Sequence, residues 1–260
     1  ILGLTWLGLA NYFVQSVNPD RDIIWGVTFS NKASEGFGID WKKNYEAILT
    51  DLHPKRVRLV AYWEDIEKNQ GSFDFSDLDW QINKSLENNT QVVLALGMKA
   101  PRWPECHIPE WAKNIATGDR ENALRGYIFK TIERYKNNPS IVMWQVENEP
   151  YLAFGECPER GSNFLEEEIK IVKGLDRSRP ILTTDGGEFG LWYKAARKGD
   201  IFGTTMYRKV YSNNLNKLFG LGVFEYPLNP YFFHFKRKLT RFIIKDYNKP
   251  FLVSELQAEP

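Results

Sequence analysis

The sequence has few of the residues that bind metals. It contains three histidines and two cysteines in 260 residues, and Cys106 and Cys157 do not form a Cys-x-x-Cys pair. A zinc site is therefore not expected. An excess of charge of one sign is also missing, because 34 lysines and arginines nearly balance 33 aspartates and glutamates. Nothing in the charge favours a nucleic-acid partner.

No internal repeat, low-complexity tract or flexible linker interrupts the chain, whose length fits one large α/β barrel domain or two ordinary domains. The apolar segment Ile1–Val14 is shorter than the roughly 20 residues of a full membrane span. Since the chain starts without Met, we predict that residues 1–20 are the remainder of a signal peptide or membrane anchor. The alternative is a strand or helix of the barrel. The first reading predicts an exported protein, whether extracellular, periplasmic or anchored to a membrane.

Short apolar runs alternate with segments of helical periodicity along most of the chain. This order is typical of a parallel sheet wrapped in helices. Several of the runs are continuously apolar or β-branched, as expected of strands buried on both faces. The predicted strands are Trp25–Phe29, Arg56–Tyr62, Gln91–Gly97, Ile141–Val146, Pro180–Thr184, Asp200–Tyr207 and Pro250–Ser254.

Six predicted helices separate these strands. One follows Asp40, a potential N-cap, and another follows Ser76 and Asp79, which resemble a capping box. The aromatic stretch Val210–Tyr231 is predicted to be a long loop. The pattern predicts an α/β fold, a (β/α)8 TIM-type barrel over residues 21–260 that is truncated after strand seven and lacks the eighth βα unit.

Two predicted strands end in a glutamate. The fourth runs into Asn148-Glu149-Pro150, and the seventh runs into Glu255. Active sites of parallel barrels lie at the carboxyl ends of the strands, so both carboxyl groups are expected at one face. Cleavage of a glycosidic bond needs one carboxyl group to protonate the leaving oxygen and a second to act at the anomeric carbon. Glu149 and Glu255 are therefore the candidate catalytic pair.

The sequence resembles glycoside hydrolase clan A, which includes cellulase-like, mannanase-like and β-galactosidase-like enzymes. The resemblance runs from about Trp25 to Glu255 and rests on Asn148-Glu149-Pro150 and Glu255. It implies that Glu149 is the general acid/base and Glu255 the nucleophile. It further implies that Asn148 binds the sugar 2-hydroxyl, that Arg58 lies near the nucleophile, and that Tyr207 donates a hydrogen bond to the nucleophile.

The loop after the third predicted strand carries further candidates for substrate binding, Trp103 and His107. Aromatic residues make up 15% of the chain, and flat aromatic faces suit pyranose rings, although they also fill large cores. In an exported protein, Cys106 and Cys157 are expected to form a disulfide between two neighbouring loops. Two unrelated free thiols are the alternative.

The leading hypothesis is a retaining glycoside hydrolase that cleaves β-linked oligo- or polysaccharides, without metal or organic cofactor. A carbohydrate-binding protein without turnover on the same barrel is a competing hypothesis, since a fold does not fix a function. A transglycosylase, which would use the same residues with a sugar acceptor, is a third. The sugar, the linkage and the oligomeric state are not predicted by the sequence.

Overall fold

A computed structural model describes residues 22–187, 190–207, 209–211, 223–225 and 230–256. The described residues form one parallel sheet of seven strands and one antiparallel hairpin. The strands of the parallel sheet are β1 (Gly26–Thr28), β2 (Arg56–Val60), β3 (Gln91–Leu96), β4 (Ile141–Val146), β5 (Ile181–Asp185), β6 (Ile201–Met206) and β9 (Phe251–Leu256). Each predicted strand corresponds to one of them, which confirms the α/β barrel.

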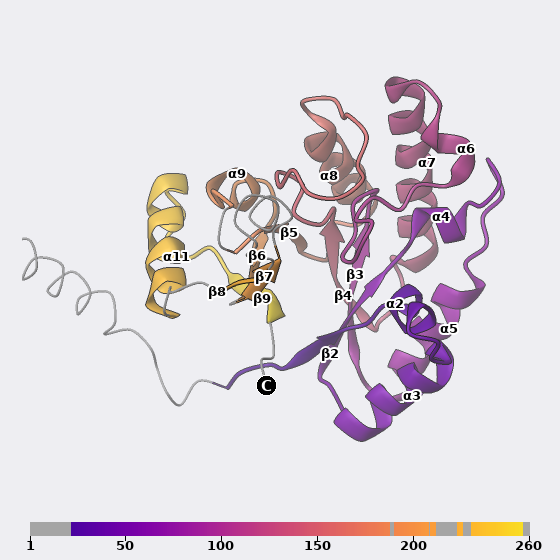
Figure 1. Ribbon diagram of the computed structural model, residues 1–260, viewed down its shortest axis with the longest axis horizontal. Helices are drawn as coiled ribbons and strands as arrows, with labels where there is room; N and C mark the ends of the chain where they lie inside the picture. The colour runs from indigo at the N-terminus through magenta and orange to yellow at the C-terminus, as the bar shows by residue number, and fades with distance from the viewer. Residues whose placement is uncertain (1–21, 188–189, 208, 212–222, 226–229, 257–260) are drawn as a thin grey trace, which may run out of the picture.

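The strands lie side by side in the order in which they occur along the chain. Every neighbouring pair is parallel, so all seven carboxyl ends point to one face. The sheet curls until its edge strands approach each other, and the hydroxyl of Thr28 in β1 donates to the carbonyl of Ser254 in β9 at 3.4 Å. The result is a nearly closed TIM-type barrel (Figure 1).

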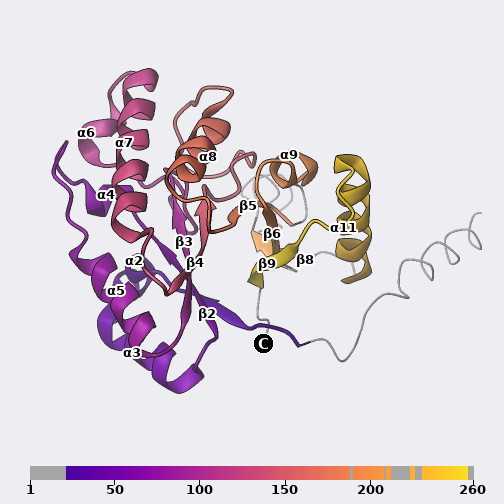
Figure 2. The same cartoon turned by 180° about the vertical axis from the view of Figure 1, so that it is seen from behind.

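Helices cover the outside of the barrel between successive strands (Figures 1 and 2). Asp40 is the N-cap of the helix that follows it and accepts from the amides of Lys42 and Lys43. The capping box is wrong, because Ser76 is the first residue of its helix and Asp74 accepts its amide instead. The main helices are α3 (Trp41–Leu52), α5 (Ser76–Glu87), α7 (Thr117–Tyr135), α8 (Phe164–Leu175) and α11 (Pro230–Ile244).

Several short elements are additions to the predicted set. The hairpin of β7 (Lys209–Tyr211) and β8 (Val223–Glu225) overlaps the stretch predicted to be a loop. The added short helices are α2 (Asn31–Gly36), α4 (Trp63–Ile66) and α6 (Glu110–Lys113). A further short helix, α9 (Tyr193–Ala196), confirms the helix predicted near Leu191–Arg197.

The core lies between the barrel strands and the helices and includes Trp63 and Trp144, both fully buried. The indole of Trp144 also donates to Asp176 at 2.9 Å, so its buried N–H has a partner. The segment predicted as a signal peptide or anchor, residues 1–20, lies outside the described residues. Among the helices that are described, none has the length and apolar character needed to cross a bilayer.

Candidate active site

The carboxyl ends of β4, β6 and β9 bring Glu149 and Glu255 to the same part of the barrel mouth. Glu255 lies in β9, and Glu149 follows β4 after a tight turn. Thr205 in β6 connects them: its hydroxyl donates to Glu149 Oε1 at 3.2 Å, and it is the register partner of Glu255. The two glutamates are 106 residues apart in sequence, but both lie next to Thr205 near the carboxyl end of β6.

Glu255 is surrounded by hydrogen-bond donors. Arg58 donates from Nη1 to its Oε1 at 2.8 Å, and the hydroxyl of Tyr207 donates to its Oε2. A second guanidinium, that of Arg102, lies 3.7 Å from Oε2. Burial by itself raises the pKa of this carboxyl, but Arg58, Tyr207 and Arg102 outweigh it and lower the pKa overall. Glu255 is therefore held as a carboxylate.

Arg58 fixes Asn148 as well as Glu255. It rises from the second strand, is 6% exposed, and uses its three nitrogens for three different side chains. Nη2 donates to Asn148 Oδ1 at 2.7 Å, and Nε donates to Gln145 Oε1 at 2.7 Å. A guanidinium has a fixed fork geometry, so these bonds set the positions of the carboxylate and the amide relative to each other.

Glu149 has the opposite environment. It is 8% exposed, and the hydroxyl of Thr205 is a neutral donor. Burial raises the pKa of Glu149 to about 7, the charges of Glu255 and Glu105 add to the rise, and Lys99 opposes it. The surroundings therefore favour the protonated form of Glu149 and the charged form of Glu255, which suits an acid and a nucleophile.

The turn after β4 holds strained backbone. Glu147 (φ 59°) and Glu149 (φ 44°) both lie in the left-handed region, which is unfavourable for residues other than glycine. Glu147 anchors the turn, because its carboxylate accepts from the amides of Met98 and Lys99 at 2.7 Å each. Gly97, with φ 119°, is required beside it, since a Cβ there would lie 2.6 Å from Glu147 Oε1. Glu147 points away from the catalytic pair.

His107, predicted to bind substrate, has other partners in the structure. Its ring is 2% exposed, Nδ1 lies 2.9 Å from Glu64, and Nε2 lies 3.3 Å from the carbonyl of Arg102. Both ring nitrogens are thus occupied within the protein. His107 supports the backbone of Arg102, which has a φ of 90°, and leaves no ring nitrogen for a sugar.

Trp103 lies on the surface of the same loop. It is 63% exposed and packs edge-on against Phe154 of the loop after β4, with ring centroids 6.0 Å apart. An exposed aromatic pair beside the barrel mouth is a suitable platform for a sugar ring. The structure thus leaves Trp103 available for the role predicted from the sequence.

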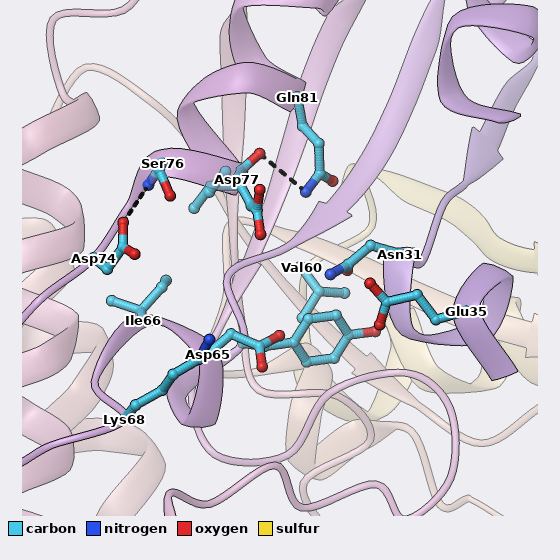
Figure 3. A pocket seen from close by; sticks show the side chains of 12 residues that line it. Asn31, Glu35, Val60, Asp65, Ile66, Lys68, Asp74, Ser76, Asp77 and Gln81 are labelled. Carbon is cyan, nitrogen blue, oxygen red and sulfur yellow. Dashed lines mark hydrogen bonds between the residues drawn. The ribbon is translucent and has the colours of Figure 1, made fainter. Parts of the chain in front are cut away.

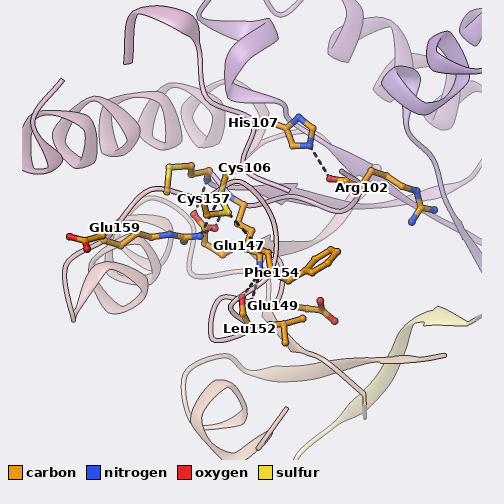
Figure 4. Close-up of a disulfide and its surroundings, with 12 residues drawn as sticks. Arg102, Cys106, His107, Glu147, Glu149, Leu152, Phe154, Cys157 and Glu159 are labelled. Atoms are coloured by element: carbon orange, nitrogen blue, oxygen red, sulfur yellow. Dashed lines mark hydrogen bonds and ion pairs between the residues drawn. A yellow bond between two sulfur atoms is a disulfide. The ribbon is translucent and has the colours of Figure 1, made fainter. Parts of the chain in front are cut away.

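A disulfide joins the loops after β3 and β4. Cys106 and Cys157 have Cα atoms 5.1 Å apart, and Figure 4 shows the bridge in the same loop region as Glu147, Glu149 and Phe154. Arg160 follows in the second loop and pairs with Glu147 at 2.9 Å. The loops that carry Trp103 and Glu149 are therefore tied together by the disulfide, and the Glu147 carboxylate adds bonds to the amides of Met98 and Lys99 in the first loop.

A separate pocket lies beside β2 and α5, with a volume of about 160 Å³ (Figure 3). Its lining is acidic, with Glu35, Asp65, Asp74 and Asp77 around it. Neither glutamate of the candidate pair lines it. Within the described part of the chain, no group of three or more His, Cys, Asp and Glu side chains could hold a metal ion.

The structure adds functional residues that the sequence reasoning did not select. Gln145 is a polar residue within an apolar strand, a signal that would have marked it as an inward-facing partner of Arg58. Thr205 and Lys99 carried no such signal, because threonine is common in strands and lysine is common in loops. Arg102 and Glu105 belong to a loop whose path is set by the disulfide.

Residues 89–259 match the family model of the TIM barrel domain of glycosyl hydrolases family 2. The β-galactosidase BgaA of Clostridium cellulovorans is 22% identical over 173 residues, which are 58% of this chain and 26% of that protein. A probable mannan endo-1,4-β-mannosidase A of Aspergillus niger is 31% identical over 107 residues, 40% of this chain and 24% of that one.

Solved structures share the fold. A glycosylated endo-β-1,4-xylanase of glycoside hydrolase family 10 from Gloeophyllum trabeum superposes with a TM-score of 0.59 and 14% identity, over 90% of this chain and 73% of that one. The chain spans about a quarter of the length of the curated relatives it matches first.

Proposed function

This chain belongs to glycosyl hydrolases family 2, whose TIM barrel domain it carries, and we propose that it hydrolyses β-linked glycosides by double displacement between Glu149 and Glu255. The observation that carries the proposal is the contrast between the surroundings of the two carboxyl groups. Arg58 and Tyr207 both donate to Glu255, whereas Glu149 is buried and accepts from the neutral hydroxyl of Thr205. Burial raises the pKa of Glu149, and Arg58 and Tyr207 help to lower that of Glu255.

In the first step, the Glu255 carboxylate attacks the anomeric carbon while Glu149 gives its proton to the glycosidic oxygen. The bond from the anomeric carbon to the leaving group breaks, and a glycosyl ester of Glu255 forms. The ester has no charge, so the pKa of Glu149 falls once the step is complete. Glu149 then takes a proton from water as the water attacks the anomeric carbon, and Glu255 is released as a carboxylate.

The neighbouring side chains support this division of roles. Arg58 joins Glu255 to Asn148, so an amide beside the nucleophile is in place for a hydroxyl of the bound sugar. Thr205 holds the acid through a hydroxyl that donates to either protonation state of Glu149 Oε1. Trp103 and Phe154 offer an apolar face for a further sugar unit.

The curated relatives are named for β-galactosidase, mannosidase and xylanase activities, so aryl β-galactosides, β-mannosides and β-xylosides are the first substrates to test. Glu255→Ala is expected to lower turnover by about 10³-fold or more, because no other carboxylate takes its place. Glu149→Ala is expected to be partly rescued by azide, which can attack the ester without a base.

Recovery of a β-glycosyl azide, with the configuration of the substrate, would support the retaining mechanism. An α-configured first product would indicate inversion instead. Saccharide binding without turnover in the wild type and in both variants would support the non-catalytic alternative. Transfer to added sugar in preference to water would identify a transglycosylase.

The disulfide supports a further proposal, that the protein works in an oxidising, extracytoplasmic compartment, because such bridges persist there. Protein isolated from its natural source is then expected to show no thiol reactive at Cys106 or Cys157 after unfolding. Two reactive thiols would place the protein in a reducing compartment.

A further inference from the structure

The pocket beside β2 and α5 is built at the same end of the barrel as the catalytic pair. Val60 is the last residue of β2, and Tyr62 follows it. Asn31 begins α2, which follows β1, and Gln81 lies in α5, which follows β2. Because the strands are parallel, the segments that follow β1 and β2 lie on the face that also carries Glu149.

The inner wall of the pocket is buried and mostly apolar. Its apolar and aromatic members are Val60, Tyr62, Ile66 and Leu78. Two amide side chains complete this wall, Asn31 with 9% of its surface exposed and Gln81 with 4%. A ligand in the pocket therefore meets apolar surface together with two buried amides.

The two amides have hydrogen-bonding groups that the protein does not use. Among the described residues, the side chain of Asn31 has no hydrogen-bond partner, and that of Gln81 makes one bond, from Nε2 to the carbonyl of Asp77 at 3.3 Å. By contrast, Asn44 of the neighbouring α3 donates to Ser34 at 3.0 Å. Figure 3 shows the amide groups of Asn31 and Gln81 pointing into the pocket. Since buried amides normally find partners, these two are available to a ligand.

The charges at the mouth of the pocket are nearly balanced. The charged side chains that line it are Glu35, Asp65, Asp74, Asp77 and Lys68. Two further lysines pair with this set, because Lys32 Nζ lies 2.8 Å from Asp65 and Lys42 Nζ lies 3.7 Å from Asp77. Three lysines thus offset four carboxylates. The small excess of one sign favours a neutral ligand over a strongly charged one.

A single sugar unit matches this combination of groups. Each sugar hydroxyl both donates and accepts, and the Asn31 amide offers donors and an acceptor, while the carboxylates accept. The C–H face of a sugar ring can pack against the apolar wall. The volume of about 160 Å³ equals that of about five water molecules in the liquid, so the pocket suits one ring and not a longer chain.

We propose that this pocket is a secondary binding site for one unit of a saccharide, separate from the cleft of Glu149 and Glu255. Tyr62 connects the two places. Its ring packs edge-on against His107 with centroids 4.6 Å apart, and His107 Nε2 lies 3.3 Å from the carbonyl of Arg102, whose guanidinium lies beside Glu255. A polysaccharide that occupies the pocket is held on the face of the catalytic pair, so the pocket favours long substrates over single-sugar glycosides. The choice of saccharides as the ligand class rests on the proposed function.

Binding can be tested without turnover. Protein carrying Glu149→Gln and ¹⁵N in its asparagine and glutamine side-chain amides is titrated by NMR with β-1,4-linked galactotetraose, mannotetraose and xylotetraose. The two signals of the pocket are identified by their loss in Asn31→Ala and Gln81→Ala, and both are expected to shift in a saturable way with at least one of these saccharides.

The affinity is followed at the Gln81 signal. Asn31→Ala is expected to weaken binding by about fivefold or more, since it removes the unpaired amide, and the fold does not depend on that side chain for a hydrogen bond. Asn83→Ala, which removes an exposed amide from the same helix as Gln81, is the matched control and should leave the affinity unchanged.

Two results would overturn the proposal. Shifts confined to Asn148 would place the saccharide in the catalytic cleft alone, and shifts of Asn31 and Gln81 caused by putrescine but by none of the saccharides would assign the pocket to an organic cation. In kinetics, Asn31→Ala should raise KM for an aryl β-tetraoside with kcat unchanged, and it should leave the matching aryl monoside unaffected. Equal KM values for the tetraoside in both proteins contradict the preference for long substrates. An inactive wild type would refute the proposed function, and the titration would still decide on the pocket.

Discussion

Replacing Glu149 by glutamine tests whether the site stores unfavourable energy for its chemistry. Burial raises the pKa of Glu149 from 4.5 to about 7. A carboxyl group with a raised pKa in the folded state binds its proton more tightly there than in the unfolded chain. The folded protein therefore loses stability as the pH rises from 4.5 through 7, and the loss is complete above that range.

The size of the effect follows from the shift. A rise of about 2.5 units corresponds to about 3 kcal/mol at pH 8, at 1.36 kcal/mol per unit, and to less than about 1 kcal/mol at pH 5. Glutamine is isosteric, keeps an oxygen that accepts from Thr205, and never ionises. Glu149→Gln is therefore expected to be more stable than the wild type at pH 8 and nearly equal to it at pH 5, while it loses acid catalysis.

Urea denaturation at the two pH values, followed by fluorescence, measures the difference in free energy of unfolding. Glu35→Gln, at an exposed position of α2, serves as the matched control and should behave like the wild type at both values. A Glu149→Gln variant that is no more stable than the wild type at pH 8 would refute the reasoning. The Glu149 carboxyl of the wild type would then be solvated, and it would not be suited to act as an acid.

Three further outcomes are expected. Replacing Cys106 and Cys157 by serine should lower the free energy of unfolding by up to about 4 kcal/mol, the chain-entropy value for a bridge spanning 51 residues, as measured by urea denaturation. An undiminished stability would mean that the loops hold without the bridge. Tyr207→Phe removes a hydrogen bond that lowers the pKa of Glu255, so the acid limb of kcat/KM should move to higher pH. A limb that stays in place would remove Tyr207 from that role. Arg58→Lys keeps the positive charge but loses the forked guanidinium that binds three side chains. We expect kcat to fall about 100-fold, with the fold intact by circular dichroism. Near-normal turnover would show that charge alone suffices.

The barrel was predictable because strands buried on both faces appear in the sequence as nearly continuous apolar runs. Ile141–Val146 and Phe251–Leu256 are runs of mostly apolar residues, and each is found as a strand at the expected position. The short helices α4 and α6, with four residues each, are too short to show helical periodicity. They were missed for that reason, and the hairpin β7–β8 was missed because its partners are separated by a long connection.

The site was predictable only where a residue follows a strand. Glu149, Glu255 and Tyr207 lie at strand ends, and the parallel register brings strand ends together whatever the loops do. Residues in loops depend on three-dimensional paths that a sequence does not state. His107, selected as a substrate contact, is bonded to Glu64, and Arg102, which was not selected, lies 3.7 Å from the Glu255 carboxylate.

Glu147 and Glu149 show why a carboxylate cannot be assigned a role from its position in sequence alone. They are two residues apart in the same strained turn, and both are buried. The Glu147 carboxylate accepts from two backbone amides and pairs with the guanidinium of Arg160, whereas the Glu149 carboxyl accepts from the hydroxyl of Thr205. The first is thereby stabilised and offsets the strain of the turn, while the second remains under-solvated and near the pKa that acid/base catalysis needs. Glu147, whose carboxylate has several partners, thus holds the turn that positions Glu149, whose carboxyl has few. Removing the Glu147 side chain should disable the acid as surely as removing Glu149 itself.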